Sequence, residues 1–170
     1  MAAVCVEVAD AVVAMIRNRQ FNLDFVLERS YAEWDLELKE LDNLELQESD
    51  KLRVDVVAHT TDQEVNLQTR SKVGMIVPVD IAIRRKFGPD KQDPDTGRVL
   101  LAEVDALMEF TQKLYLMFMP TRLTSFPDAT WDEENGGTTI EVAPMRQHLR
   151  ELHQFTGIIR VVFKASLEIG

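Results

Sequence analysis

The stretch MIVPVDIAIRRKF, residues 75–87, carries the strongest secondary-structure signal in this chain. Apolar side chains at every second position from Met75 to Ile83 share one face of an extended chain, while Asp80, Arg84 and Lys86 share the other. Pro78 falls on that second face, and because proline has no N–H for the ladder, it predicts an edge position, a bulge or a strand start. We therefore expect a long strand with a local interruption.

Further alternating segments on both sides of this stretch predict a sheet. Leu52–His59 is the clearest, because Val54, Val56 and Ala58 lie on one face, opposite Asp55 and Val57. Thr60, Thr61 and Asp62 supply a turn directly after it. The other expected strands are residues 25–38, as a strand or an extended arm, 140–143 as a short strand, and 159–169 as a terminal strand.

Two segments carry apolar residues at helical spacing. Val8, Val12 and Ile16 predict an amphipathic helix over residues 4–20, although the opening Val4-Cys5-Val6-Glu7-Val8 alternation also fits a short strand. A longer apolar stripe predicts a helix that ends before Pro120. Its expected members are Leu100, Leu101, Val104, Leu107, Met108, Thr111, Leu114, Tyr115 and Phe118.

Three segments carry turn signals. Residues 88–97 predict an exposed loop that joins strand to helix, with Asp95 or Thr96 as the helix cap. Within residues 120–137, Asn135-Gly136-Gly137 predicts the tip of a hairpin. Residues 148–155 predict a turn or short helix.

Together these elements predict an α+β fold, with a mainly antiparallel sheet and two amphipathic helices packed on one face. The 170 residues suit a single domain spanning 1–170, which is long enough to bury its own core. No internal repeat interrupts this order.

The charge of the chain limits its partners. It has 19 Lys and Arg against 29 Asp and Glu, a net charge of −10, which opposes a broad footprint on nucleic acid or anionic lipid. No apolar run approaches the ~18 residues that span a bilayer, so we expect neither secretion nor membrane insertion. Cys5 is the only cysteine and lies in an apolar run, so it predicts a small buried side chain in a reducing compartment.

Signals for catalysis or metal binding are weak in the sequence. His148 and His153 are five residues apart, which does not align two ligands on one helical face, and His59 lies far from both along the chain. Residues 93–97 resemble a calcium loop, but the glycine comes one place early and Val104 stands where the carboxylate ligand belongs. We therefore expect ordinary histidines, no cofactor, no metal and no enzymatic activity.

Several segments, taken in order, resemble the tail terminator family of long-tailed bacteriophages. They are residues 28–31 (ERSY), 35–41 (DLELKEL), 52–57 (LRVDVV), 68–71 (QTRS), 81–86 (IAIRRK) and 154–163 (QFTGIIRVVF), with the long helix before the last. The likeness spans most of the chain from Glu28 onward, and the order of the segments carries it. Residues 120–137 depart from the family pattern as an extended segment.

The resemblance implies a small α+β subunit that forms a ring, usually a hexamer, on the last ring of the tail tube. Such a ring ends tube growth and provides the surface for joining to the head. The implied partners are copies of the chain itself, the tail tube protein and neck or connector proteins. DNA would pass through the lumen without specific binding, and the protein would reside in the virion after assembly in the host cytoplasm.

A ring subunit needs different patches that close by rotation, so exposed strand edges and projecting loops are candidate docking elements. We expect them at residues 60–72 and 88–97, although both segments also fit an ordinary hairpin or connection. The candidate interface residues are Thr61, Asp62, Gln63, Glu64, Arg70, Lys72, Asp90, Lys91, Asp93 and Asp95. The acidic balance is compatible with a lumen that repels DNA, although it also fits a surface charge that only keeps the protein soluble.

Two other functions fit the same pattern. Another neck or head-completion connector subunit uses a small ring-forming α+β domain at a neighbouring position. A small-ligand-binding or catalytic domain would require a deep pocket with convergent polar groups and shifted titrations.

Overall fold

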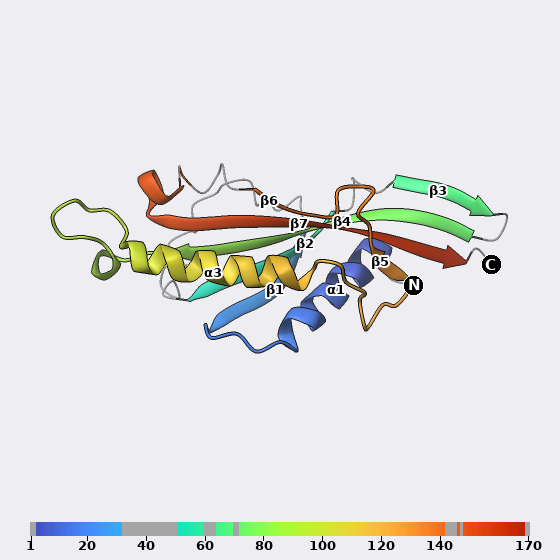
Figure 1. Ribbon diagram of the computed structural model, residues 1–170, viewed down its shortest axis with the longest axis horizontal. Coiled ribbons are helices and arrows are strands. Elements are labelled where there is room, and N and C mark those ends of the chain that lie inside the picture. Colours follow the sequence, from blue (N-terminus) through green and yellow to red (C-terminus); the bar gives the residue numbers. More distant parts are fainter. Residues whose placement is uncertain are drawn as a thin grey trace.

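The computed structural model describes residues 3–31, 51–59, 64–69, 72–141, 146 and 148–168. One sheet carries two longer helices, α1 (Val4–Arg17) and α3 (Leu101–Met117), on the same face (Figure 1). The apolar side chains of both helices and of the sheet form one hydrophobic core. The α+β fold class predicted from the sequence is therefore confirmed.

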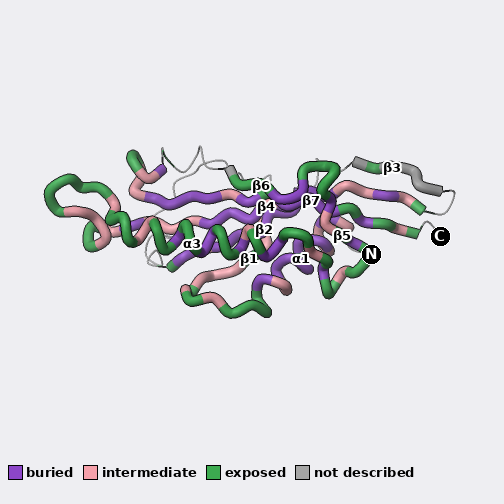
Figure 2. Tube along the Cα trace, in the orientation of Figure 1, coloured by how far each residue is buried: buried purple, intermediate pink, exposed green. Residues whose placement is uncertain are grey.

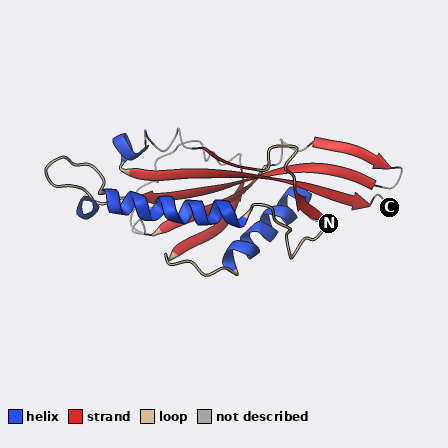
Figure 3. Cartoon of the chain, in the orientation of Figure 1, coloured by secondary structure: helices blue, strands red, loops and turns tan. Residues whose placement is uncertain are grey.

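The described residues contain seven strands in a single sheet (Figure 3). The strand order is β1-β2-β4-β7-β5, with β3 also paired to β4 and β6 also paired to β7. Only β1 and β2 are parallel, and every other pair is antiparallel. The strands are β1 (Phe25–Tyr31), β2 (Leu52–Ala58), β3 (Glu64–Thr69), β4 (Lys72–Lys86), β5 (Ala129–Trp131), β6 (Thr138–Glu141) and β7 (Gln154–Glu168). The expected continuations at residues 32–38, 142–143 and 169, and the turn at 60–62, lie outside the described residues.

The long strands β4 and β7 form the centre of the sheet. They pair without a break from Lys72 opposite Glu168 to Lys86 opposite Gln154. Most residues in the middle of both strands are buried, with Asp80 partly buried and Arg160 exposed (Figure 2). The alternation that predicted residues 75–87 as a strand thus marks the sheet's central strand, whose Val77, Val79, Ile81 and Ile83 belong to the core that the helices cover.

Pro78 lies inside β4, opposite Val162, and the strand is not interrupted there, contrary to the expectation from the sequence. On the other side of β4, pairing with β3 ends at Ile76 and pairing with β2 begins at Val79. Pro78 thus occupies the gap between two neighbouring strands. Among the described residues no strand pairs with Pro78 on this side, which agrees with the edge position that the sequence offered as one possibility, and a missing N–H is tolerated there.

Helix α1 packs on the sheet as its periodicity predicts. Val8, Val12 and Ile16 are fully buried against the sheet, and the helix ends at Arg17, three residues before the expected end at Gln20. Cys5 is also buried, at the start of the same helical face.

Helix α3 buries part of the expected stripe, Leu107, Thr111 and Leu114, together with Phe110 and Met117, which were not expected. Phe110 packs its ring edge-on against Phe21, with ring centroids 5.1 Å apart, and also contacts Phe25. The buried residues of the helix follow that large side chain at intervals of three and four: Leu107, Phe110, Thr111, Leu114 and Met117. Three residues of the expected stripe, Leu100, Leu101 and Met108, are exposed instead. The first turns of α3 therefore leave apolar side chains at the surface.

Residues 120–137 do not form the predicted hairpin. β5 and β6 both pair with β7 and run in the same direction, so residues 132–137 project as a loop from one continuous edge. The Asp132 N–H donates to the Val162 carbonyl at 3.0 Å, and the Val162 N–H donates to the Gly137 carbonyl at 2.9 Å. Asp132 and Gly137 thus share one partner residue. The Asn-Gly-Gly turn returns the chain to the ladder instead of reversing it.

Gly137 tests how tightly this loop closes, because its φ is +58° and an added Cβ would lie 2.9 Å from Cζ2 of Trp131. We expect Gly137→Ala to lower the free energy of unfolding by at least about 2 kcal/mol, from left-handed backbone strain plus overpacking. Gly97→Ala is the matched control, with a φ of +65° and open space around the site. Gly97→Ala should lower the free energy of unfolding by only about 1 kcal/mol, and urea unfolding measures both variants. Equal costs would show that Trp131 does not press on Gly137.

Candidate functional site

The first predicted docking segment, residues 60–72, contains strand β3, which the sequence did not predict as a separate strand. Glu64 opens strand β3, and Lys72 opens β4. The Lys72 ammonium lies 4.0 Å from a carboxylate oxygen of Glu168, at the far end of β7. The other candidates in this segment, Thr61, Asp62, Gln63 and Arg70, lie outside the described residues.

Strand β3 lies at an edge of the described sheet, because β4 is the only described strand that it pairs with. Figure 1 shows β3 and the adjoining ends of β4 and β7 extending past both helices. Val65 on β3 is 61% exposed, although it is an apolar residue in a strand. An exposed strand edge with an apolar side chain is a template for pairing with another chain.

The second predicted segment, residues 88–97, is a compact loop with a short 3-10 helix, Pro89–Lys91. The Asp93 N–H donates to the Arg98 carbonyl at 2.7 Å, and the Gly97 N–H donates to the Asp93 carbonyl at 2.8 Å. Lys91 forms an ion pair with Glu103 of α3 at 3.0 Å. Asp90 and Asp95 are exposed on the same loop. Internal bonds therefore set the shape of this candidate docking element.

The predicted helix cap at Asp95 or Thr96 is wrong. Helix α3 begins at Leu101, and no side chain caps it. The carboxylate of Asp93 instead accepts the N–H groups of Thr96 and Asp95, at 2.8 and 2.9 Å. These backbone hydrogen bonds hold the pKa of Asp93 below its ordinary value, the bond from Thr96 contributing most. The side chain that accepts backbone N–H groups here is that of Asp93, and it closes a turn that precedes the helix.

The face of the sheet opposite the helices carries a polar network. Sequence alternation placed Asp55 and Val57 on the second face of β2, and the structure buries both, leaving Asp55 only 4% exposed. Arg53 of β2 lies directly opposite Arg84 of β4. Two like charges facing each other across strands destabilise a sheet unless an anion lies between them.

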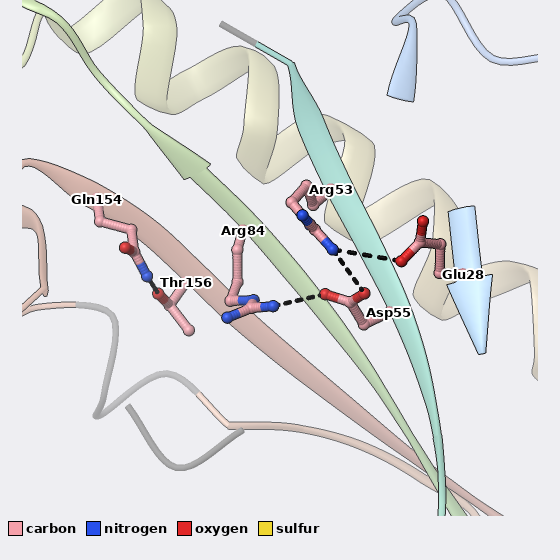
Figure 4. Close-up of polar contacts among 6 residues, drawn as sticks. All are labelled: Glu28, Arg53, Asp55, Arg84, Gln154 and Thr156. Atoms are coloured by element: carbon pink, nitrogen blue, oxygen red, sulfur yellow. Dashed lines mark hydrogen bonds and ion pairs between the residues drawn. The ribbon is translucent and has the colours of Figure 1, made fainter. Parts of the chain in front are cut away.

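Asp55 supplies that anion. One of its carboxylate oxygens accepts a 2.7 Å hydrogen bond from Arg84, and the other lies 3.8 Å from the Arg53 guanidinium. Arg53 also reaches Glu28 of β1 at 3.4 Å (Figure 4). The charges thus alternate across β1, β2 and β4, which fixes the lateral register of three strands.

A second group on the same face joins β4, β7 and His59, the residue directly after β2. His59 Nε2 lies 2.7 Å from Asp80, and Arg160, directly opposite Asp80, donates two hydrogen bonds to the same carboxylate. Burial alone would raise the pKa of Asp80, but hydrogen bonds from Arg160 and His59, with their charges, outweigh it and lower the pKa. Asp80 therefore remains ionised at neutral pH.

A third polar group joins β7 to the short π-helix η3 (His148–Leu152). Thr156 Oγ1 accepts a 3.0 Å hydrogen bond from Gln154 Nε2 and lies 2.6 Å from His148 Nδ1 (Figure 4 shows the first contact). All three side chains are buried. The sequence analysis did not predict this group of polar side chains. Its one signal in the sequence was that polar residues recur at every second position on strands that are otherwise strongly apolar.

The arrangement is suited to holding strands together. The charged groups of Asp55 and Asp80 are engaged by neighbouring cations, and within the described residues no group of three or more His, Cys, Asp or Glu is placed to hold a metal ion. In the described part of the chain, no helix is both long and apolar enough to cross a bilayer.

No protein-family model matches the sequence, and no curated protein is significantly similar to it.

Removing the carboxylate of Asp55 should leave Arg53 and Arg84 facing each other without an anion. We expect Asp55→Ala to lower the free energy of unfolding by about 3 kcal/mol or more, as for one partner removed from a buried ion pair. Glu28→Ala is the matched control, because its carboxylate is 59% exposed and bonds only one edge of the network. Glu28→Ala should lower the free energy of unfolding by less than about 1 kcal/mol. Urea unfolding measures both, and similar losses would contradict the central position of Asp55.

Proposed function

We propose that this chain is a structural virion subunit that forms a ring at the head-proximal end of a phage tail tube. In this role the ring ends tube polymerisation and provides the surface to which the head joins. The observation that carries the proposal is the exposed β3 edge at the end of the sheet, within a segment expected from the sequence to dock. The family resemblance gives the place in the particle.

The resemblance and the sheet support each other. Four of the segments that resemble the tail terminator family lie on β1, β2, β4 and β7, which are consecutive neighbours in the sheet. A likeness distributed in this way concerns the whole scaffold and not one local motif. The α+β fold is also the class that the resemblance implies.

The described sheet offers two different edges for a ring. On one side of β4 lies β3, and on the far side of β7 lie β5 and β6. A head-to-tail ring closes when one surface of each subunit meets a different surface of the next. We infer that the β3 edge is one of these surfaces, and that the 88–97 loop contacts a tube or neck protein.

The charge of the chain suits a channel for DNA. A net charge of −10 gives passing DNA no broad cationic surface to bind. In the proposed ring, acidic side chains line the lumen and DNA passes without specific contacts. A lumen lined mainly by Lys and Arg would contradict this part of the proposal.

A deletion and complementation experiment tests the function and the interface together. Phage that lack this chain should form tails of irregular, excessive length that do not join to heads, and the unaltered chain supplied in trans should restore both. Val65→Lys should fail to restore them, because a lysine on an exposed edge opposes strand pairing. Leu116→Lys, at a 56% exposed apolar position on α3, is the matched control and should complement.

The readout is the distribution of tail lengths and the fraction of joined particles in electron micrographs. Tails of normal length that join normally to heads in the deletion would contradict the tail terminator role. Full complementation by Val65→Lys would instead leave the role intact and remove the β3 edge as an interface.

A further inference from the structure

A hollow of about 620 Å³ lies at the end of the sheet where the 88–100 loop, the start of α3 and η3 meet. Segments far apart in the sequence build its walls. Its lining residues are Thr96, Gly97, Arg98, Val99, Leu101, Val104, Leu149, Arg150 and His153. The volume is that of a site for a short peptide segment or a comparable ligand.

The inner wall of this hollow, next to the hydrophobic core, is apolar. Val99, Val104 and Leu149 are half-buried and pack against the hydrophobic core, so they are fixed in place. Leu101, by contrast, is 79% exposed, the most exposed large apolar side chain of the described residues. A leucine held at the mouth of a hollow, on the first turn of a rigid helix, favours an apolar contact from outside.

The rim of the hollow is cationic. Arg98 and Arg150 are both exposed, and neither guanidinium has a hydrogen bond or ion pair with any described residue. Their neighbours Arg85 and Lys91 differ, because both pair with Glu103. None of the residues that line the hollow is acidic, although the chain as a whole has a net charge of −10. The hollow is therefore a local exception to the charge of the molecule.

His153 completes the rim between η3 and β7. Its φ of +50° is the only positive value at a non-glycine position among the described residues. The His153 carbonyl accepts a 2.8 Å hydrogen bond from the Phe87 N–H, which ties this unusual backbone to the end of β4. The position of His153 is consequently fixed by the sheet, as expected for a built site.

We propose that this hollow binds an acidic, leucine-bearing segment of a second polypeptide. Leucine-type side chains would cover Leu101 and the apolar wall, and Asp or Glu carboxylates on either side would meet Arg98 and Arg150. A small inorganic anion would satisfy the arginines but leave Leu101 exposed. The proposal stands apart from the ring, because it rests on the hollow and its charges and not on the β3 edge.

The test is a titration of the full chain with a labelled hexapeptide made only of leucine and glutamate. Fluorescence anisotropy should show saturable binding that weakens as salt rises, since rim ion pairs are screened. Amide NMR signals should shift at residues 96–104 and 149–153. The Arg98→Glu, Arg150→Glu double variant should raise Kd about tenfold or more, from the loss and reversal of two exposed pairs.

Two controls distinguish binding at this site from non-specific binding. Arg19→Glu changes an exposed arginine that follows α1 and should leave Kd unchanged. The same peptide with glutamine in place of glutamate should bind at least about tenfold more weakly.

His153→Gly keeps the left-handed backbone without strain and should raise Kd while the fold, followed by circular dichroism, is retained.

Each opposite result overturns the proposal. It falls if the peptide does not bind at millimolar concentration, or if the NMR shifts lie elsewhere. It falls equally if the glutamine peptide binds as well, because the arginines would then have no part in recognition. Equal weakening by Arg19→Glu would mean that net charge alone governs the binding.

Discussion

The structure depends on the pairing of β4 with β7. This ladder runs the full length of both strands, and every other described strand is attached to it directly, except β1, which is attached through β2. Because long, uninterrupted pairing of two distant segments fixes the register of everything beside it, the edges of the sheet can vary. The partner change at Pro78 and the loop at residues 132–137 are both edge features of this kind.

The two faces of this ladder have different chemistry. The helix face excludes water with apolar side chains from α1, α3 and the sheet. The opposite face carries charged and polar side chains that pair across strands, with Asp55 buried between two arginines and the partly buried Asp80 between His59 and the exposed Arg160. Buried charges whose partner is lost are costly, so this face penalises any slip in strand register. A rigid sheet of this type can present its edge and its end to other molecules without changing shape.

Much of the fold could be predicted from the sequence, because alternation and helical spacing report which residues share a face. The strand at residues 75–87, the helix that begins at Val4, the helix before Pro120 and the terminal strand all follow from that signal. The face of α3 was predicted only in part: Leu107, Thr111 and Leu114 are buried as expected, but the burial of Phe110 depends on its contacts with Phe21 and Phe25, which lie far from it in the sequence.

The candidate surfaces were harder to predict. Alternation on β2 assigned Asp55 to the opposite face but could not tell that this face is buried, since that depends on the pairing with Arg84. β3 is short and polar, so only its pairing with β4 reveals it. The hollow at Arg98 and Arg150 joins residues about fifty positions apart, which no local pattern connects. The ring itself remains a proposal drawn from the resemblance and the exposed edge.

Native-state hydrogen exchange tests the central claim most directly. If the β4–β7 ladder holds the molecule together, the amides of Ile81 and Ile159 should exchange only through global unfolding, with the full unfolding free energy. Amides of β3 and β5 should exchange through local openings of much lower free energy. Exchange of Ile81 or Ile159 at a free energy as low as that of β3 would contradict the account.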